Sequence, residues 1–257
     1  ISAEALYHIY GFGAGAAGNT VAPWNNINGV QGRAATAFVT QLIAGSIGVP
    51  ATTVAANSAK IHVTNGELIN EVFAFGNTGD PNVPIGFASG SNAHAGELPA
   101  DPIATPPKVK TLAYQHYGQS CAYLPDSQRG AADKANVRNG QYWIWTPAWF
   151  YGYVNNQGQL VDENVEKLIT WFDGTRPPPG DLDIQKIVVD SGDIPLCAMH
   201  AMRAEGDLSP IGSYAPANPC NGWFEFTAKG STDYASCTTT DDCEGEQTCR
   251  FGYCEAY

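Results

Sequence analysis

Positively charged side chains are scarce in this chain of 257 residues. It carries 13 Lys and Arg against 25 Asp and Glu, which gives a formal net charge of −12 at pH 7. The basic residues are scattered and form no patch in the sequence. Because nucleic acids and anionic membrane surfaces are bound through a cationic face, we expect neither of them as a partner.

Long apolar runs are also missing. No stretch is long enough and apolar enough to cross a bilayer, and no signal peptide is recognisable. The chain starts with Ile-Ser-Ala-Glu rather than Met, from which we expect a processed or truncated chain. With 44% apolar and 15% charged residues, the composition is typical of a globular protein with one large core or two lobes.

Common catalytic signatures are absent from the sequence. It contains no Gly-x-Ser-x-Gly elbow, no His-Glu-x-x-His and no plausible pair of carboxylates. Gly13, Gly15 and Gly18 match the spacing of the dinucleotide fingerprint, but they follow a predicted helix, whereas the fingerprint requires a preceding strand. We therefore expect no enzyme activity and no cofactor.

Seven cysteines form the most informative pattern that is present. Four of them lie in the last 21 residues: Cys237, Cys243, Cys249 and Cys254. This density indicates disulfides and hence the periplasm, the cell surface or the exterior. A zinc site is the weaker alternative, because the tail has no Cys-x-x-Cys pair and no nearby His.

The other three cysteines are expected to include one further disulfide, between Cys121 and Cys197. Cys220 is then left over, and an odd cysteine in an oxidising compartment indicates a bond to another polypeptide. Met199 and His200 follow Cys197 closely, so soft copper ligands are an alternative. We favour the disulfide and expect no metal.

An arginine immediately precedes a predicted helix in the first quarter of the chain. Arg33 follows a Gly-Val-Gln-Gly turn, and apolar residues recur at helical spacing from Thr36 until Gly48. The first helical turn has unpaired N–H groups, which together with the hydroxyls of Thr36 and Thr40 and the guanidinium of Arg33 suit an oxyanion. The alternative is an arginine on a solvated loop before an ordinary amphipathic helix.

Local signals place several other elements. Thr64 and Glu67 form a capping-box pattern before a helix, and Asp162 is expected to cap another. Residues 141–154 are the most aromatic stretch, which predicts a buried strand or, alternatively, a platform on which sugars or bases stack. Residues 220–226 are predicted to form a final strand.

The order and spacing of residues 1–47 resemble the second lobe of phosphate-type periplasmic solute-binding proteins, which have the class II binding-protein fold. In that family a helix precedes a Gly-rich turn and a Trp-Asn or Trp-Asp pair, here Trp24 and Asn25, and a strand then leads to an arginine, here Arg33. After three intervening residues the family has Ser-Gly-Thr at a helix N-terminus. Those positions are occupied here by Ala37, Phe38 and Val39.

The resemblance extends to about residue 226 and implies an α/β, two-lobed class II fold in which the N-terminal part of lobe one is absent from this chain. Residues 1–138 would form lobe two, residues 139–229 the returning part of lobe one, and residues 230–257 a small disulfide-rich module. The module resembles bacterial surface modules of similar Cys spacing. We expect its first cysteine to pair with the third and its second with the fourth, although four cysteines allow three connectivities.

The resemblance also implies a function: capture of a small oxyanion or anionic organic solute in a cleft between the lobes, without chemistry. The implied ligand-binding residues are Arg33, Thr36, Ala37, Phe38 and Thr40. A second polypeptide would supply the rest of lobe one and could be linked through Cys220. The alternative is a non-binding surface or assembly component built on the same fold, which the replaced Ser-Gly-Thr and the cysteine tail favour.

Two lost hydroxyls at the Ser-Gly-Thr positions weaken the case for phosphate itself. We expect a larger, partly apolar ligand with its anionic end at Arg33 and its body against Phe38. Replacement of Arg33 by Ala is expected to abolish binding and to leave the melting temperature nearly unchanged.

Overall fold

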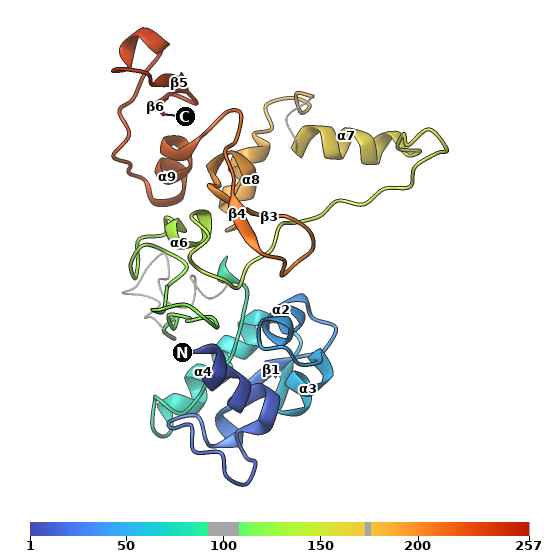
Figure 1. Cartoon of the computed structure of the whole chain (residues 1–257), viewed down its shortest axis with the longest axis vertical. Helices are drawn as coiled ribbons and strands as arrows, with labels where there is room; N and C mark the ends of the chain where they lie inside the picture. Colours follow the sequence, from blue (N-terminus) through green and yellow to red (C-terminus); the bar gives the residue numbers. More distant parts are fainter. Residues whose placement is uncertain (92–107, 173–175, 257) are drawn as a thin grey trace. The chain divides into compact units, whose positions relative to one another are not determined.

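The chain is a mixed α and β protein in the computed structural model (Figure 1). The structure describes residues 1–91, 108–172 and 176–256. The chain divides into two compact units, each built from two stretches of sequence. Unit 1 comprises Ile1–Thr146 and Ala201–Gly212, and unit 2 comprises Pro147–His200 and Ser213–Tyr257. The mixed α/β class is thus confirmed, and the two-lobed binding-protein architecture stays a prediction.

Unit 1 contains most of the helices. Their bounds are α1 (Ala3–Leu6), η1 (Tyr7–Gly13), η2 (Ile27–Gly29), α2 (Phe38–Ser46), α3 (Ala51–Ala56), α4 (Asn65–Asn77) and α6 (Ala135–Arg138). The predicted first helix begins as expected, because the Ser2 side chain accepts a hydrogen bond from the N–H of Ala5. It then widens into the π-helical η1. The side chain of Asn57 donates to the carbonyls of Tyr10 and Gly11, which satisfies backbone acceptors in this wider turn.

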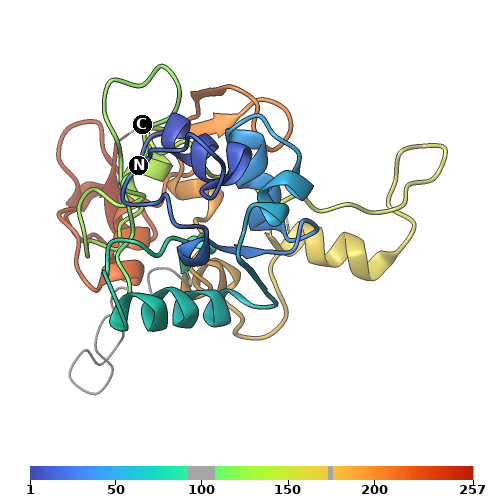
Figure 2. The same ribbon diagram turned by 90° about the horizontal axis from the view of Figure 1, so that it is seen from below.

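A small parallel sheet organises unit 1. Strand β1 (Gln31–Arg33) pairs in parallel with β2 (Lys60–His62), and on the other side of β1 Val30 forms a parallel bridge with Ile85. Figure 2 draws α4 on one side of β1 and the earlier helices on the other. The order of the three extended segments is therefore second, first, third along the chain, with β1 in the centre.

The core of unit 1 packs around this sheet and the first two helices. Its buried members are Ala3, Leu6, Ile9, Tyr10, Ala14, Val30, Ile43, Ala44, Ile47, Val54, Ile85 and Tyr114. Tyr10 is fully buried, and its hydroxyl donates to the carbonyl of Gln31 at 3.0 Å. This contact fixes the first helical segment against the central strand, while the aromatic body of Tyr10 supplies apolar burial.

Unit 2 contains five described helices and three disulfides. Its helices are α7 (Glu163–Phe172), α8 (Ile184–Asp190), η3 (Leu196–Ala198), α9 (Asn221–Lys229) and η4 (Thr240–Asp242). Among the described residues, β5 (Thr248–Arg250) pairs with β6 (Tyr253–Glu255) in unit 2, while β3 (Ala201–Arg203), which belongs to unit 1, pairs with β4 (Ile211–Ser213). Residues 220–226 are not a strand: Cys220 precedes α9, so that prediction is wrong.

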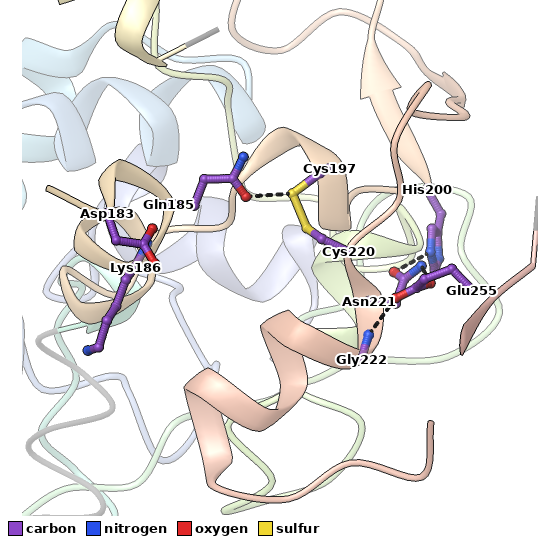
Figure 3. The surroundings of a disulfide bond; sticks show 9 residues. All are labelled: Asp183, Gln185, Lys186, Cys197, His200, Cys220, Asn221, Gly222 and Glu255. Atoms are coloured by element: carbon purple, nitrogen blue, oxygen red, sulfur yellow. Dashed lines mark hydrogen bonds between the residues drawn. A yellow bond between two sulfur atoms is a disulfide. The ribbon is translucent and has the colours of Figure 1, made fainter. Parts of the chain in front are cut away.

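The predicted disulfide between Cys121 and Cys197 is also wrong. Cys197 is bonded to Cys220, with a Cα–Cα distance of 5.3 Å, and the N–H of Cys220 donates to the carbonyl of Cys197 (Figure 3). Cys121 lies in unit 1 and is exposed. Sequence spacing could not show that the start of α9 packs beside η3. Since Cys220 is already bonded, the expected link to a second polypeptide through Cys220 is wrong as well.

The C-terminal module, residues 230–257, contains two internal disulfides and is hydrogen-bonded to the start of α9. Its disulfides join Cys237 to Cys249 and Cys243 to Cys254, which is the expected connectivity. The buried carboxylate of Glu255 accepts from the side chain of Asn221 at 2.9 Å and from the N–H of Gly222 at 2.8 Å (Figure 3). A negative charge at the N-terminus of α9 is favoured by the helix dipole, so Glu255 ties the module to the rest of unit 2.

Among the described residues, no helix combines the length and the apolar character needed to cross a bilayer.

Candidate functional site

The candidate site lies at the carboxyl edge of the parallel segments in unit 1. Arg33 ends β1, His62 ends β2, and Ser89 follows the segment that bridges through Ile85. Because the chain leaves β1 toward β2 on one side and later returns beside β1 on the other, this edge is a topological switch point. Ligands of open α/β sheets bind at such points, so the topology independently singles out the region that holds the predicted residues.

Helix α2 starts at this edge without a side-chain cap. Its N-cap is Ala37 in an extended conformation, whose methyl group cannot accept a hydrogen bond. The turn before it uses the N–H of Ala37, which donates to the carbonyl of Ala34. Within the described part of the chain, the N–H groups of Phe38 and Val39 have no acceptor. The positive end of the α2 dipole is therefore open to an anion.

The two threonines of the predicted site differ in environment. Thr36 is exposed, whereas Thr40 is fully buried in the first turn of α2. Among the described residues, the Thr40 hydroxyl finds no hydrogen-bond partner. A buried unpaired hydroxyl costs about 1–3 kcal/mol, so its presence calls for an explanation. Phe38 lies at the start of the same helix and is 52% exposed.

Arg33 is held by the chain itself. Its Nε donates to the carbonyl of His62 at 3.0 Å and one terminal nitrogen donates to the carbonyl of Val63 at 2.6 Å. The other terminal nitrogen donates to Oδ1 of Asn65. Three of the five donors of the guanidinium thus join the end of β1 to the start of α4, and two remain for a ligand. This bonding conflicts with the expectation that Arg33 contributes little to stability.

Asn65 and Ser89 belong to this edge and were not predicted. Asn65 is the first residue of α4, which begins with the predicted capping box: Thr64 accepts from the N–H of Glu67, and Glu67 accepts from the N–H of Thr64. The Asn65 side chain donates to the Ser89 hydroxyl at 3.0 Å. The capping box placed Asn65 at a helix N-terminus, but only the parallel packing of β1 and β2 brings it to Arg33.

His62 lies beneath this edge and is not available to a ligand. It is 5% exposed, and its Nε2 lies 3.0 Å from Oε1 of Gln31. The Gln31 amide nitrogen donates to the carbonyl of Asn28, so Oε1 is the acceptor and His62 Nε2 carries a proton. Burial lowers the pKa of His62, which keeps the imidazole neutral near pH 7.

Metal binding finds little support in the side chains that the structure describes. One group of possible metal ligands lies close together. The sulfur atoms of Cys237, Cys243 and Cys254 are within 4.8 Å of one another. All three are in disulfides and so offer no thiolate. The copper alternative fails for the same reason, because Cys197 is bonded to Cys220 and offers no thiolate. Oε1 of Gln185 lies 3.1 Å from the sulfur of Cys197, which carries no proton in the disulfide (Figure 3).

Comparisons with family models, with curated proteins and with solved structures find no match for this chain. The resemblance to solute-binding proteins therefore stays a prediction.

Proposed function

We propose that this chain binds a small anionic solute at the carboxyl edge of β1 and performs no chemistry on it. The observation that carries the proposal is the buried hydroxyl of Thr40, which has no partner among the described residues. It belongs to the same helical turn as the unpaired N–H groups of Phe38 and Val39. A bound oxyanion would satisfy such donors, and the α2 dipole would favour its charge.

The ligand we propose is an anionic organic molecule rather than inorganic phosphate. The dipole contributes up to about 2 kcal/mol in a partly buried geometry, whereas each donor lost from the family's Ser-Gly-Thr leaves an oxygen unpaired at a cost of about 1–3 kcal/mol. Since Arg33 keeps only two uncommitted donors, the site holds a small anionic group weakly. The half-exposed ring of Phe38 offers an apolar surface for the rest of the ligand.

The proposed setting is extracytoplasmic. Three disulfides are present, and disulfides persist in oxidising compartments such as the periplasm or the cell surface. The resemblance also implies that a second polypeptide supplies the opposite wall of the cleft. With Cys220 already bonded, that polypeptide would associate without a link to Cys220.

A non-binding surface or assembly component is the second candidate. It is favoured by Arg33, whose donors to the carbonyls of His62 and Val63 give the side chain a structural role that needs no ligand. In that case the unpaired hydroxyl of Thr40 would be a tolerated defect.

Titration calorimetry of the Thr40→Val variant separates the two candidates. Titrants are phosphate, sulfate, arsenate and a series of aliphatic and aromatic carboxylates. Valine matches the shape of threonine but lacks the hydroxyl, so we expect about tenfold weaker binding of the best carboxylate, equivalent to about 1.4 kcal/mol. The free energy of unfolding should be unchanged or higher, because an unsatisfied buried group has been removed.

Thr36→Val is the matched control, since Thr36 is exposed and precedes the same helix. Absence of binding of any titrant by the unaltered protein would favour the non-binding component, whereas unchanged affinity in Thr40→Val would show that Thr40 does not contact the ligand. Micromolar affinity for phosphate would show that the ligand class is wrong.

A further inference from the structure

Unit 2 contains an exposed segment rich in aromatic residues, which we call the aromatic arm. We define the arm as residues 147–172: an extended segment, a tight turn and α7. Val154 forms an antiparallel bridge with Leu160, the N–H of Asn155 donates to the carbonyl of Gln159, and the N–H of Val161 donates to the carbonyl of Tyr153. Figure 1 draws the extended segment and its turn leading into α7. Residues 141–154 were predicted to form a buried strand, and this part of them lies exposed instead.

The extended segment has two different faces. The ring of Phe150 lies 5.0 Å from that of Phe172 on α7, and a side chain at Gly152 would run into Leu160 and Val165. Side chains alternate along an extended segment, so the odd-numbered residues point away from α7. They are Trp149, Tyr151 and Tyr153, which are 48%, 86% and 91% exposed.

One backbone edge of this segment is unpaired. The hydrogen bonds of the hairpin come from Tyr153 and Asn155, which flank Val154, so the N–H and C=O of Val154 point to the opposite edge. Alternation places those of Gly152 and Phe150 at that same edge. Among the described residues, the N–H groups of Phe150, Gly152 and Val154 have no acceptor. Such an edge is a template for another strand.

The charge pattern indicates what covers this edge. Soluble proteins usually protect edge strands with charged side chains, yet residues 139–161 contain no Asp, Glu, Lys or Arg. A strongly charged partner would find no complementary group there. A second copy of this chain, despite a net charge of −12, meets no like charge on this segment.

The exposed apolar area is also sufficient for a dimer. A fully exposed aromatic side chain presents about 200 Å², so the five aromatic residues of the arm that are more than one-third exposed present about 600 Å² together. They are Trp149, Phe150, Tyr151, Tyr153 and Phe172. With the exposed Val154, Val161 and Leu168 the total over both faces of the arm reaches about 800 Å², an upper limit that is comparable with what one partner buries in an interface of standard size. None of the α7 residues is buried within the chain.

We infer that the arm is a homodimer interface, in which the free edge of residues 150–154 pairs antiparallel with the same edge of a second copy. A two-fold axis at Gly152 places Phe150 opposite Val154 of the second copy and Tyr151 opposite its Tyr153. The two tyrosine pairs are cross-strand aromatic contacts on the outer face. The interface uses residues of unit 2 and needs nothing from the anion site in unit 1, so either proposal can fail without the other.

Sedimentation equilibrium of the full chain over a range of concentrations tests the inference. The variant Tyr151→Lys/Tyr153→Lys puts like charges opposite each other, and we expect the dimer dissociation constant to rise at least tenfold. The variant Tyr151→Glu/Tyr153→Lys loses the same aromatic rings but puts opposite charges face to face. We expect its dissociation constant to be at least threefold below that of the Lys/Lys variant. Circular dichroism checks that each variant folds.

Val63→Lys is the matched control, because Val63 is an 81% exposed apolar residue of unit 1. It should leave the dissociation constant unchanged. A protein that stays monomeric at every concentration overturns the inference, as does a dimer that Val63→Lys weakens equally. Equal dissociation constants for the Lys/Lys and Glu/Lys variants would overturn the pairing about Gly152.

Discussion

Two arginines have structural roles in which backbone carbonyls are the main acceptors. Arg203 is 2% exposed, and its guanidinium donates to the carbonyls of Trp143, Trp145 and Ser209 at 2.5, 2.9 and 2.5 Å. It also lies over the indoles of both tryptophans, 5.0 Å from each ring centroid. Burial lowers its pKa to about 10, so it is still a cation at pH 7. Nothing in the sequence distinguished Arg203, because its partners are backbone carbonyls and two indole rings, and those of Trp143 and Trp145 come from a distant segment.

Lysine at each arginine position tests this role. Arg203→Lys should lower the free energy of unfolding by about 3 kcal/mol or more, because one ammonium cannot reach three separated carbonyls and some stay buried and unpaired. Arg33→Lys should cost about 1 kcal/mol, because Arg33 is only half-buried and water can replace the lost bonds. Urea denaturation measures both, with the exposed Lys186→Arg as control. A smaller loss for Arg203→Lys than for Arg33→Lys would contradict the structural reading of Arg203.

At the scale of single elements, local signals predicted helices better than strands. Thr64 and Asp162 cap α4 and α7 as expected, because a cap is an interaction over three residues that the sequence displays directly. Residues 220–226 were misassigned as a strand. The aromatic residues of this stretch are compatible with a strand or with the buried face of a helix. The segment forms the helix α9, which buries Phe224 in the core of unit 2.

The β1–β2 pair should make stability depend on pH through His62. Burial lowers the pKa of His62 in the folded chain, while an unfolded histidine titrates near about 6.5. As the pH falls below about 6.5, the unfolded chain takes up a proton that the folded chain does not. The free energy of unfolding therefore decreases until the folded pKa is reached, and above about pH 6.5 this group has no effect.

Chemical denaturation of His62→Gln against the unaltered chain measures this contribution. The variant should lose part of the decrease in the free energy of unfolding below about pH 6.5. Burial also lowers the pKa of His116, which therefore contributes to the pH dependence of stability in the same pH range. The contribution of His62 is for that reason measured as the difference in the free energy of unfolding between His62→Gln and the unaltered chain. Identical pH profiles for His62→Gln and the unaltered chain would contradict the role of His62.

For the molecule as a whole, the two compact units and the disulfide at Cys197 differ from the predicted scheme. The predicted boundary between the lobes lay at 138–139, whereas the compact units part at 146–147 and residues 201–212 return to unit 1. The bond between Cys197 and Cys220 stays inside unit 2 and closes a loop with a sequence separation of 23.

Peptide mapping without reduction should recover Cys197 joined to Cys220, while Cys121 should react with a thiol reagent in the folded protein. Replacement of both Cys197 and Cys220 by Ser should lower the free energy of unfolding by about 3 kcal/mol, since a loop of this length is no longer closed in the unfolded chain. Cys121→Ser should change it little. A peptide linking Cys121 to Cys197 would contradict the structure.

The sequence alone determined the features that depend on composition or on neighbours along the chain. The acidic charge, the caps at Thr64 and Asp162 and the helix after Arg33 are of this kind. The pairing of the tail cysteines was expected from a resemblance and matches the structure. Tertiary structure decided which cysteine joins Cys197, which carbonyls hold Arg33, and that the aromatic arm lies exposed. The disulfide and the contacts of Arg33 join segments that are separated in sequence and meet only when the chain folds. The exposure of the arm depends on which other segments pack against it, and no local pattern encodes either outcome.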